Sequence, residues 1–477
     1  MMNTGNNIDS SALPLDAAAA PIDSLSPAIE PPSSIIYHPP SSAALRRLRR
    51  ALLFPVKLFW GMIFCQGLLG SIFVVGWSYR LAQRFALKYW WSHSSRAQPN
   101  TTFADFLAGS ERTRDHRHWP NWFLQQDFAE ALRRQPGVSA GRYVFSVVRA
   151  FTHGLWLNFW MGLRAIANTW ALTLPACIFW WFGWYDGWNN SFNKGYEQAA
   201  VGPLVSLLGI LLFIAAMFYV PLAQARQAVT GDWRAFFEFR LVWNLARLRW
   251  VSCVGLALLY SLLALPLNIL KTSPMFWMQK HPELVYVSDA LLLKMLNDYF
   301  FWCALLMLPA YVLLRVLAAR VYASAIMASV QSGNIQPAAL AVYERETLDR
   351  LGLLETRPSR ERHVFVRFLA WTGTRVGRVL GGAALFFTWF GFVAQIYIAE
   401  FFNYHGGLGW LNQPLVQLPW FHYLPSRLKT PLGEVFFVLL AWFVALLIWS
   451  VLSTIARSTS RQASTPPPTN SLNQRSV

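Results

Sequence analysis

The sequence predicts an all-α fold: a polytopic bundle of transmembrane α-helices with amphipathic, interfacial helices on the cytoplasmic side and disordered termini. Of the 477 residues, 55% are hydrophobic and only 13% are charged, whereas soluble domains carry about 25% charged residues. Apolar runs of about 20 residues, the length that crosses a hydrocarbon core of about 30 Å, recur along the chain. These runs lack the alternation of barrel strands, and backbone groups in lipid must bond within their own segment, so each run is expected to be a helix.

The chain divides into two polar tails and one long membrane domain. Residues 1–44 are rich in Ser, Pro and Ala and have few large apolar side chains, so they cannot bury enough surface to offset the entropy cost of ordering. The tail 458–477, with its run of prolines, is expected to be disordered for the same reason. Residues 45–457 are the predicted membrane domain. Its seven predicted embedded segments are 56–77, 160–184, 201–222, 251–270, 299–319, 379–399 and 432–455.

Loop charge predicts the orientation of the second to seventh segments. A net charge of +18 would suggest a nucleic-acid partner for a soluble chain. Here the basic residues lie between apolar runs, so we expect no nucleic acid and interpret the excess as a signal of membrane orientation. The loops after the third, fifth and seventh segments are rich in arginine, and the alternate loops are poor in Lys and Arg or nearly neutral. This asymmetry predicts a regular zigzag with the C-terminus in the cytoplasm.

The first segment, 56–77, does not fit this pattern, because arginines flank it on both sides. Three alternatives are open: the segment spans against the rule, it dips into the bilayer and returns, or a second crossing lies within 143–163. Gly67 and Gly70 at its centre would allow a bend. The polar segment that follows, 78–149, has scattered aromatic residues and is predicted to be cytoplasmic, either as a small subdomain or as helices lying against the bilayer.

Two amphipathic surface helices are expected, one after the third segment and one after the fifth. The first begins with Asp232 as its N-cap and then places apolar residues at spacings of three and four. The second runs from Ile335 to Leu351 and has Gly352 as its predicted C-cap. The predicted apolar face of the first helix consists of Phe236, Phe239, Trp243, Ala246 and Trp250.

The regions around these two helices resemble each other. In both, a span ends in small residues, a Thr-Gly-Asp or Ser-Gly-Asn triplet follows at 230–232 or 332–334, and an arginine-bearing helix leads to the next span. One hypothesis is an internal duplication, which is common in transporters. The other is two independent helix starts that use the same capping chemistry.

Short motifs at predicted helix ends lie between residues 56 and 250. They are Gly76-Trp77-Ser78-Tyr79-Arg80, Pro120-Asn121-Trp122, Gly162-Leu163-Arg164 before Pro175, Pro221, Gly231-Asp232, and Phe236-Phe237-Glu238-Phe239. In these motifs the first half of the chain resembles a bacterial family of polytopic membrane proteins that is catalogued only as a domain of unknown function. The resemblance implies residence in the plasma membrane of a bacterium. It implies no established activity, and it carries over no catalytic residues.

No catalytic, cofactor-binding or metal site is predicted. The four cysteines lie singly inside apolar runs, where a thiol behaves as a small hydrophobic group. His116 and His118 would share a face on a strand, but a solvated basic loop is the preferred interpretation. The glycines within 377–382 open a span, so they are expected to allow close helix packing rather than phosphate binding. The cysteines are Cys65, Cys177, Cys253 and Cys303.

Two functions of different class follow from this architecture. The leading hypothesis is a non-enzymatic membrane organiser or scaffold, whose basic helices contact anionic headgroups of the lipid bilayer on the cytoplasmic side; each Lys or Arg contributes about 1 kcal/mol there. The alternative is a permease for a small or lipid-like solute, suggested by the possible duplication and by prolines within spans. A permease predicts a polar pocket at the bilayer midplane that contains Asn168, Thr173 or Gln395. Tight packing of those side chains would remove that support.

Overall fold

The computed structural model describes residues 55–95, 102–109, 139–182, 201–355 and 364–402, which all belong to one unit, Phe54–Val477. Over these residues the chain is helical and contains no strand. This agrees with the predicted all-α class. Both predicted tails, the seventh predicted segment at 432–455 and most of 96–138 lie outside the described residues.

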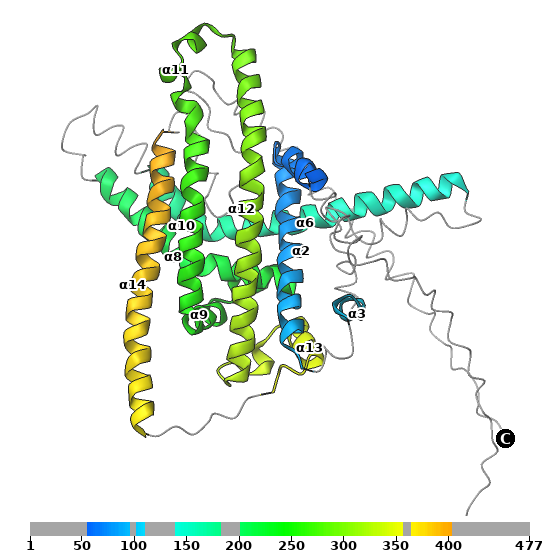
Figure 1. The fold of residues 1–477 in the computed structure, drawn as a ribbon, viewed down its shortest axis with the longest axis vertical. Helices are drawn as coiled ribbons and strands as arrows, with labels where there is room; N and C mark the ends of the chain where they lie inside the picture. The colour runs from blue at the N-terminus through cyan, green and yellow to red at the C-terminus, as the bar shows by residue number, and fades with distance from the viewer. Residues whose placement is uncertain (1–54, 96–101, 110–138, 183–200, 356–363, 403–477) are drawn as a thin grey trace, which may run out of the picture. The chain divides into compact units, whose positions relative to one another are not determined.

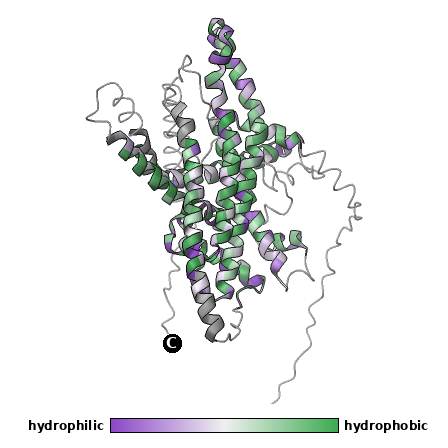
Figure 2. Cartoon of the chain, turned by 60° about the vertical axis from the view of Figure 1, so that its left-hand side comes forward, coloured by the Kyte–Doolittle hydropathy of each residue, from purple (hydrophilic) through white to green (hydrophobic). Residues whose placement is uncertain are grey.

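Four helices are long and apolar enough to cross a membrane, and they coincide with the third to sixth predicted segments. They are α8 (Val201–Thr230), α10 (Trp250–Thr272), α12 (Asp289–Gln331) and α14 (Val364–Phe402). In each, half or more of the most apolar stretch is not covered by the rest of the protein. Figure 2 shows that apolar residues predominate along the middle of the long helices where they are coloured. Exposed surface of this kind is stable when lipid surrounds it.

The first predicted segment, 56–77, is split into two helices. A ten-residue apolar helix, Pro55–Phe64, ends shortly before Gly67, and α2 (Leu68–His93) begins directly after that glycine. Ten helical residues rise about 15 Å, half the thickness of a hydrocarbon core. A Cβ atom at Gly70 would overlap the carbonyl oxygen of Phe64. The bend between the two helices therefore lies at Gly67 and Gly70, where the sequence analysis allows one.

The second half of α2 corrects the prediction for the start of segment 78–149. Residues 78–93 continue α2 and pack inside the bundle, so this part is neither a separate subdomain nor a surface helix. The buried indole of Trp90 donates a 2.9 Å hydrogen bond to the carbonyl of Ala323 on α12. Gln83 donates a 3.0 Å hydrogen bond to the carbonyl of Val229 on α8. The polar side chains that suggested a surface segment instead connect neighbouring helices. A short helix, α3 (Phe103–Ala108), follows.

A long helix, α6 (Ala140–Phe182), contains the second predicted segment as far as Phe182 but is not among the four candidate spans. It packs against α2 and α8 and crosses α2 in Figure 1. Gly76 of α2 and Gly162 of α6 mark the crossing, because a Cβ atom on either would overlap backbone of the other helix. Beside them, Arg80 donates a 3.1 Å hydrogen bond to the side-chain oxygen of Asn158. The two helices therefore approach as closely as glycine permits.

The pair α10 and α14 is packed through aromatic rings and glycine. A Cβ atom at Gly381 would overlap the indole of Trp250, which also lies against Gly377. Farther along the pair, the rings of Tyr260 and Trp389 lie 5.5 Å apart. This is the close packing that the sequence predicts for the glycines at the start of this span.

The helices α8 and α12 both end at a glycine with positive φ, and the same order of elements follows each. Gly231 has φ 70° and Gly333 has φ 71°, a conformation that glycine adopts without strain. After Gly231 come η3 (Trp233–Phe237), α9 (Phe239–Leu248) and α10. After Gly333 come η6 (Pro337–Ala339), α13 (Val342–Arg350) and α14. Gly352, with φ 64°, follows α13 at the predicted C-cap position, but the helix predicted from Ile335 begins only at Val342, because η6 comes first. This repeated order fits the duplication hypothesis. The connection from α10 to α12 consists of η4 (Ser273–Phe276), α11 (Trp277–Lys280) and η5 (Pro282–Tyr286).

Candidate functional site: an apolar pocket beside a basic helix

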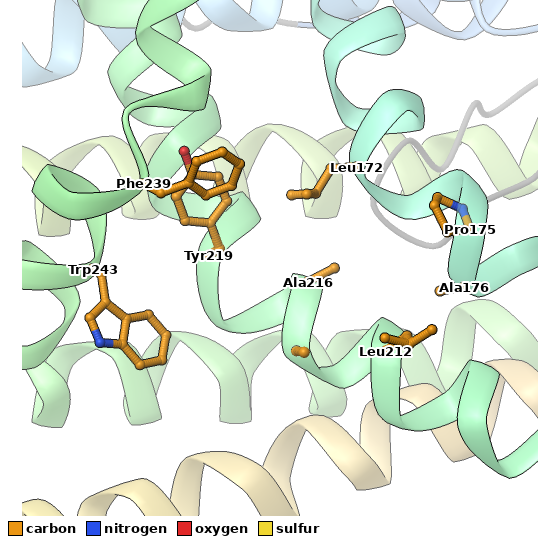
Figure 3. Close-up of a pocket in the computed structure, with 9 residues that line it drawn as sticks. Leu172, Pro175, Ala176, Leu212, Ala216, Tyr219, Phe239 and Trp243 are labelled. Atoms are coloured by element: carbon orange, nitrogen blue, oxygen red, sulfur yellow. The ribbon is translucent and has the colours of Figure 1, made fainter.

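An apolar pocket lies between α6, α8 and α9. Its volume is about 440 Å³, within the range of about 300–1,000 Å³ that small-molecule sites occupy. Figure 3 shows its lining side chains, which come from all three helices. The lining residues are Leu172, Pro175, Ala176, Leu212, Ala215, Ala216, Tyr219, Phe239 and Trp243.

Helical spacing brings the lining residues of α6 and α8 onto one side of each helix. On α8, Leu212, Ala216 and Tyr219 follow at intervals of four and three residues, and on α6, Leu172 and Ala176 are four residues apart. Residues at these intervals lie above one another on a single helix face. The alanines have short side chains, so they leave room between the two helices that larger residues would fill.

The helix α9 supplies the third wall and places a positive charge next to it. Phe239 and Trp243 lie one turn apart, line the pocket and are 50% and 40% exposed. Arg247 lies one further turn along, with the carbon of its guanidinium 5.4 Å from the centre of the Trp243 ring. This distance permits a cation–π interaction. One face of α9 therefore carries two aromatic rings followed by an exposed guanidinium.

Polar contacts from α6 and α8 hold the chain that leads into α9. The hydroxyl of Tyr219 donates a hydrogen bond to the carbonyl of Phe236. Asn168 donates a 2.8 Å hydrogen bond to the carbonyl of Trp233. Because the Tyr219 hydroxyl is used in this way, Tyr219 contributes its ring to the pocket. The pocket wall is therefore built almost wholly of hydrocarbon and aromatic surface.

A buried arginine also contacts the residues that lead into α9, from the side opposite to Asn168 and Tyr219. Arg226, near the end of α8, donates 2.9 Å hydrogen bonds to Glu344 and to the hydroxyl of Tyr322, and lies 2.5 Å from Glu238. Tyr322 also donates a hydrogen bond to Glu344. Glu238 precedes α9. Glu344 lies in the first turn of α13, where the helix dipole stabilises a carboxylate. The backbone N–H of Ala341 donates to the same Glu344 carboxylate. One guanidinium thus ties both short helices to α8 and α12.

The two ion pairs of Arg226 differ in strength because they differ in exposure. The side chains of Arg226 and Glu344 are fully buried, whereas that of Glu238 is 43% exposed. Losing one partner of a buried pair costs about 3–5 kcal/mol, and exposed pairs contribute at most about 1 kcal/mol. Burial raises the pKa of the Glu344 carboxyl above its usual value, although the nearby Arg226 guanidinium and the Tyr322 hydroxyl act in the opposite direction. The carboxylates point at the guanidinium, so this cluster is suited to holding helices together.

The three residues that a permease pocket is predicted to contain do not line this pocket. Asn168 is buried and bonded to Trp233, as described above. Thr173 is fully buried and donates to the carbonyl of Thr169 in its own helix. Gln395 lies on α14, half-buried, and its side-chain oxygen has no hydrogen-bond partner among the described residues. The structure brings none of these three together.

The apolar face predicted for 232–250 is wrong in part, because the chain there is not one helix. Asp232 does act as an N-cap, accepting a 3.0 Å hydrogen bond from the backbone of Arg234, but the element it caps is η3. The helical conformation is interrupted again at Glu238, before α9 begins. The predicted spacing of apolar residues runs across this interruption, so it combines residues of η3 and α9 that do not share one helix face. Within α9 the buried side chains are Val242, Leu245 and Ala246, whereas Phe239 and Trp243 are exposed.

Sequence reasoning missed Tyr219, Tyr322 and Glu344 as parts of this region. For Glu344 the sequence signals only a carboxylate in the first turn of a short helix, where the helix N-terminus favours it, and not a buried ion pair. The loop-charge argument counts Arg226 only as one of the arginines that follow the third segment. Alanines at 223, 225 and 228 surround Arg226 and indicate close packing there, but they do not show which residue pairs with it.

No group of three or more metal-ligating side chains occurs in the part of the chain that the structure describes. Cys65, Cys253 and Cys303 are buried free thiols. His116 and His118 lie outside the described residues, so the prediction about them stays a prediction.

Known proteins add no second line of evidence for this site. Protein-family models, curated proteins and solved structures were compared with the chain, and none matches it. The family resemblance of residues 56–250 therefore stays an expectation that rests on its motifs.

Proposed function

We propose that the protein is a non-enzymatic membrane organiser that binds lipid where α9 meets the bilayer surface. The observation that carries this proposal is the pocket between α6, α8 and α9, whose walls are apolar and whose edge is basic. Four apolar helices of membrane-spanning length support residence in a bilayer. A polar substrate would gain few hydrogen bonds from such walls, whereas hydrocarbon would fit them.

We place the end of the bundle that contains Gly231 and Gly333 in the cytoplasm of a bacterium, with the protein in the plasma membrane. Arginine-rich stretches follow both α8 and α12, and an excess of Lys and Arg marks the cytoplasmic side of membrane helices. Anionic headgroups on that side would attract Arg240 and Arg247 of α9 by about 1 kcal/mol each. A seventh crossing at 432–455 would return the C-terminus to the same side.

The alternative, a permease for a small or lipid-like solute, gains less support from the contacts of the described residues. Asn168 and Thr173 bond within the protein, and the pocket is apolar. The repeated order of elements after Gly231 and Gly333 is the observation that still favours transport. Only a lipid-like solute would match the pocket.

The lipid that accompanies the purified protein tests the proposal. We expect the full-length protein, reconstituted in nanodiscs of mixed phosphatidylglycerol and phosphatidylethanolamine, to retain a larger share of the anionic lipid than the starting mixture when it is extracted into mild detergent. The enrichment should fall as salt rises, because salt screens charge attraction. A retained mixture identical to the starting one at low salt would refute lipid organisation.

Lipid exchange in proteoliposomes separates the organiser from the lipid-carrying permease. A fluorescent phospholipid placed in the outer leaflet should cross to the inner leaflet no faster with the protein than in protein-free vesicles. Faster crossing that depends on the amount of protein would favour the permease instead.

A further inference from the structure

We infer that the pocket between α6, α8 and α9 holds one acyl chain of an anionic phospholipid, whose phosphate pairs with Arg247. The inference rests on the proposed function and names its ligand. Nine residues line the pocket, and its volume is about 440 Å³. The one lining hydroxyl, on Tyr219, is bonded to the carbonyl of Phe236. The space is therefore suited to a flexible hydrocarbon chain.

The length of α8 places the pocket at the depth of acyl chains. The span Gly202–Thr230 has 29 residues, which rise about 43 Å and so exceed a hydrocarbon core of about 30 Å. The excess belongs at the Gly231 end, because the polar residues Gln224, Arg226 and Gln227 lie there. The lining residues of α8, from Leu212 to Tyr219, then fall inside the core, in the half nearest that end.

Charge at the edge of the pocket selects the kind of lipid. Phe239, Trp243 and Arg247 follow one another at intervals of one turn on α9, so the wall of the pocket leads directly to a guanidinium. Guanidinium binds phosphate through strong charge-assisted hydrogen bonds. Tryptophan favours the boundary between hydrocarbon and headgroups. A chain in the pocket and a phosphate at Arg247 therefore belong to one molecule.

Two matched pairs of variants test the inference in the full-length protein. Ala215→Trp fills the pocket from an exposed lining position, and Ala383→Trp makes the same change at an exposed alanine of α14. Arg247→Gln removes the charge beside Trp243. Arg234→Gln removes an equivalent charge that stacks 5.7 Å from Trp233, which does not line the pocket.

Native mass spectrometry of each protein, released from nanodiscs of phosphatidylglycerol and phosphatidylethanolamine, counts the retained phospholipids. We expect one phosphatidylglycerol on the wild type and on both controls, and loss of that lipid in Ala215→Trp. Arg247→Gln should bind it about fivefold more weakly, which corresponds to one headgroup contact. Retention of the lipid by Ala215→Trp, or equal retention of phosphatidylethanolamine by the wild type, would overturn the inference.

A second measurement decides the case even if Ala215→Trp does not fold. Phosphatidylglycerol that carries a photoreactive diazirine in its acyl chain should crosslink to wild-type peptides containing Leu172 or Trp243. Crosslinks spread evenly over α10, α12 and α14 would overturn the inference. If the wild type binds anionic lipid but neither the pocket variant nor the crosslinks locate it here, the acyl-chain site fails while the proposed organiser stands. Without anionic enrichment in the wild type, the organiser itself fails.

Discussion

Replacement of Arg226 by methionine should destabilise the protein more than any comparable change at an exposed charge. Methionine has a similar length but no charge, so it leaves the fully buried Glu344 without its cation. The loss of one partner of such a pair costs about 3–5 kcal/mol. The matched control is Glu238→Gln, which removes the other carboxylate of the cluster. Because Glu238 is 43% exposed, this change should cost less than about 1 kcal/mol.

The triple variant Arg226→Met, Tyr322→Phe, Glu344→Met separates the cost of an unpaired charge from the cost of lost packing. All three polar groups of the buried part of the cluster are then replaced by apolar side chains of similar size. Replacements of this kind are close to neutral or stabilising. We therefore expect the triple variant to recover most of the stability that the single Arg226→Met variant loses.

The stability of these variants can be measured through the buried thiols. Cys65, Cys253 and Cys303 are buried and free, so a thiol-reactive fluorophore in detergent reports their exposure as the protein unfolds on heating. The Arg226→Met variant should unfold at a lower temperature than the wild type. The difference should shrink toward pH 5, because protonation of Glu344 removes the unpaired charge. An unchanged unfolding temperature for Arg226→Met, or a triple variant no better than the single one, would refute the reasoning.

Three further predictions concern single residues. Gly76→Ala should cost about 1–3 kcal/mol, because the added methyl overlaps the carbonyl of Asn158; the thiol assay measures it, and wild-type stability would contradict the close crossing of α2 and α6. Gly231→Ala should lower the free energy of unfolding by about 1 kcal/mol, because alanine is strained at a φ of 70°. The control Gly255→Ala, at an open helical position, should not lower the unfolding temperature, and equal losses at both sites would contradict the role of φ. The folded pKa of Glu344 is raised above the usual 4.5, so stability should fall as pH rises from 4.5 through that raised pKa; Glu344→Gln should remove this slope, and an unchanged slope would assign it elsewhere.

The candidate spans were predictable because their signal is local. A run of apolar residues long enough for a bilayer specifies a helix through the solvent alone, and α8, α10, α12 and α14 lie where the sequence places them. The turns at Gly231 and Gly352 were also predictable, since positive φ favours glycine. In both cases the cause and the structure lie within the same short stretch of chain.

The cluster around Arg226 could not be predicted in the same way, because its cause is a contact between distant residues. Arg226 and Glu344 are 118 positions apart, and no local pattern shows that they meet. The second half of α2 illustrates the same limit. Gln83 and Trp90 are compatible with a surface in the sequence, and only their bonds to α8 and α12 explain why they are buried.

The apolar pocket had only a partial signal. Its alanines and Leu212 lie within two predicted segments, 160–184 and 201–222, where small residues commonly mark close helix packing. Here α9 lies across the gap instead, because contacts at Trp233, Phe236 and Glu238 hold the start of that helix in place. A break of one residue at Glu238 changed which side of α9 faces the bundle. Helical periodicity cannot show such a break in advance.

The length of α12 has a mechanical consequence. The helix continues for 12 residues beyond the predicted span 299–319, which is about 18 Å of rigid rod outside the hydrocarbon. Tyr322, which meets Arg226 of α8, lies at the start of this extension, and the turn at Gly333 follows its far end. A helix tilts when bilayer thickness changes, and a tilt of about 10° would swing the end of this lever sideways by about 3 Å. Such a tilt would move the turn at Gly333, from which η6 and α13 continue, far more than the contact of Tyr322 with Arg226.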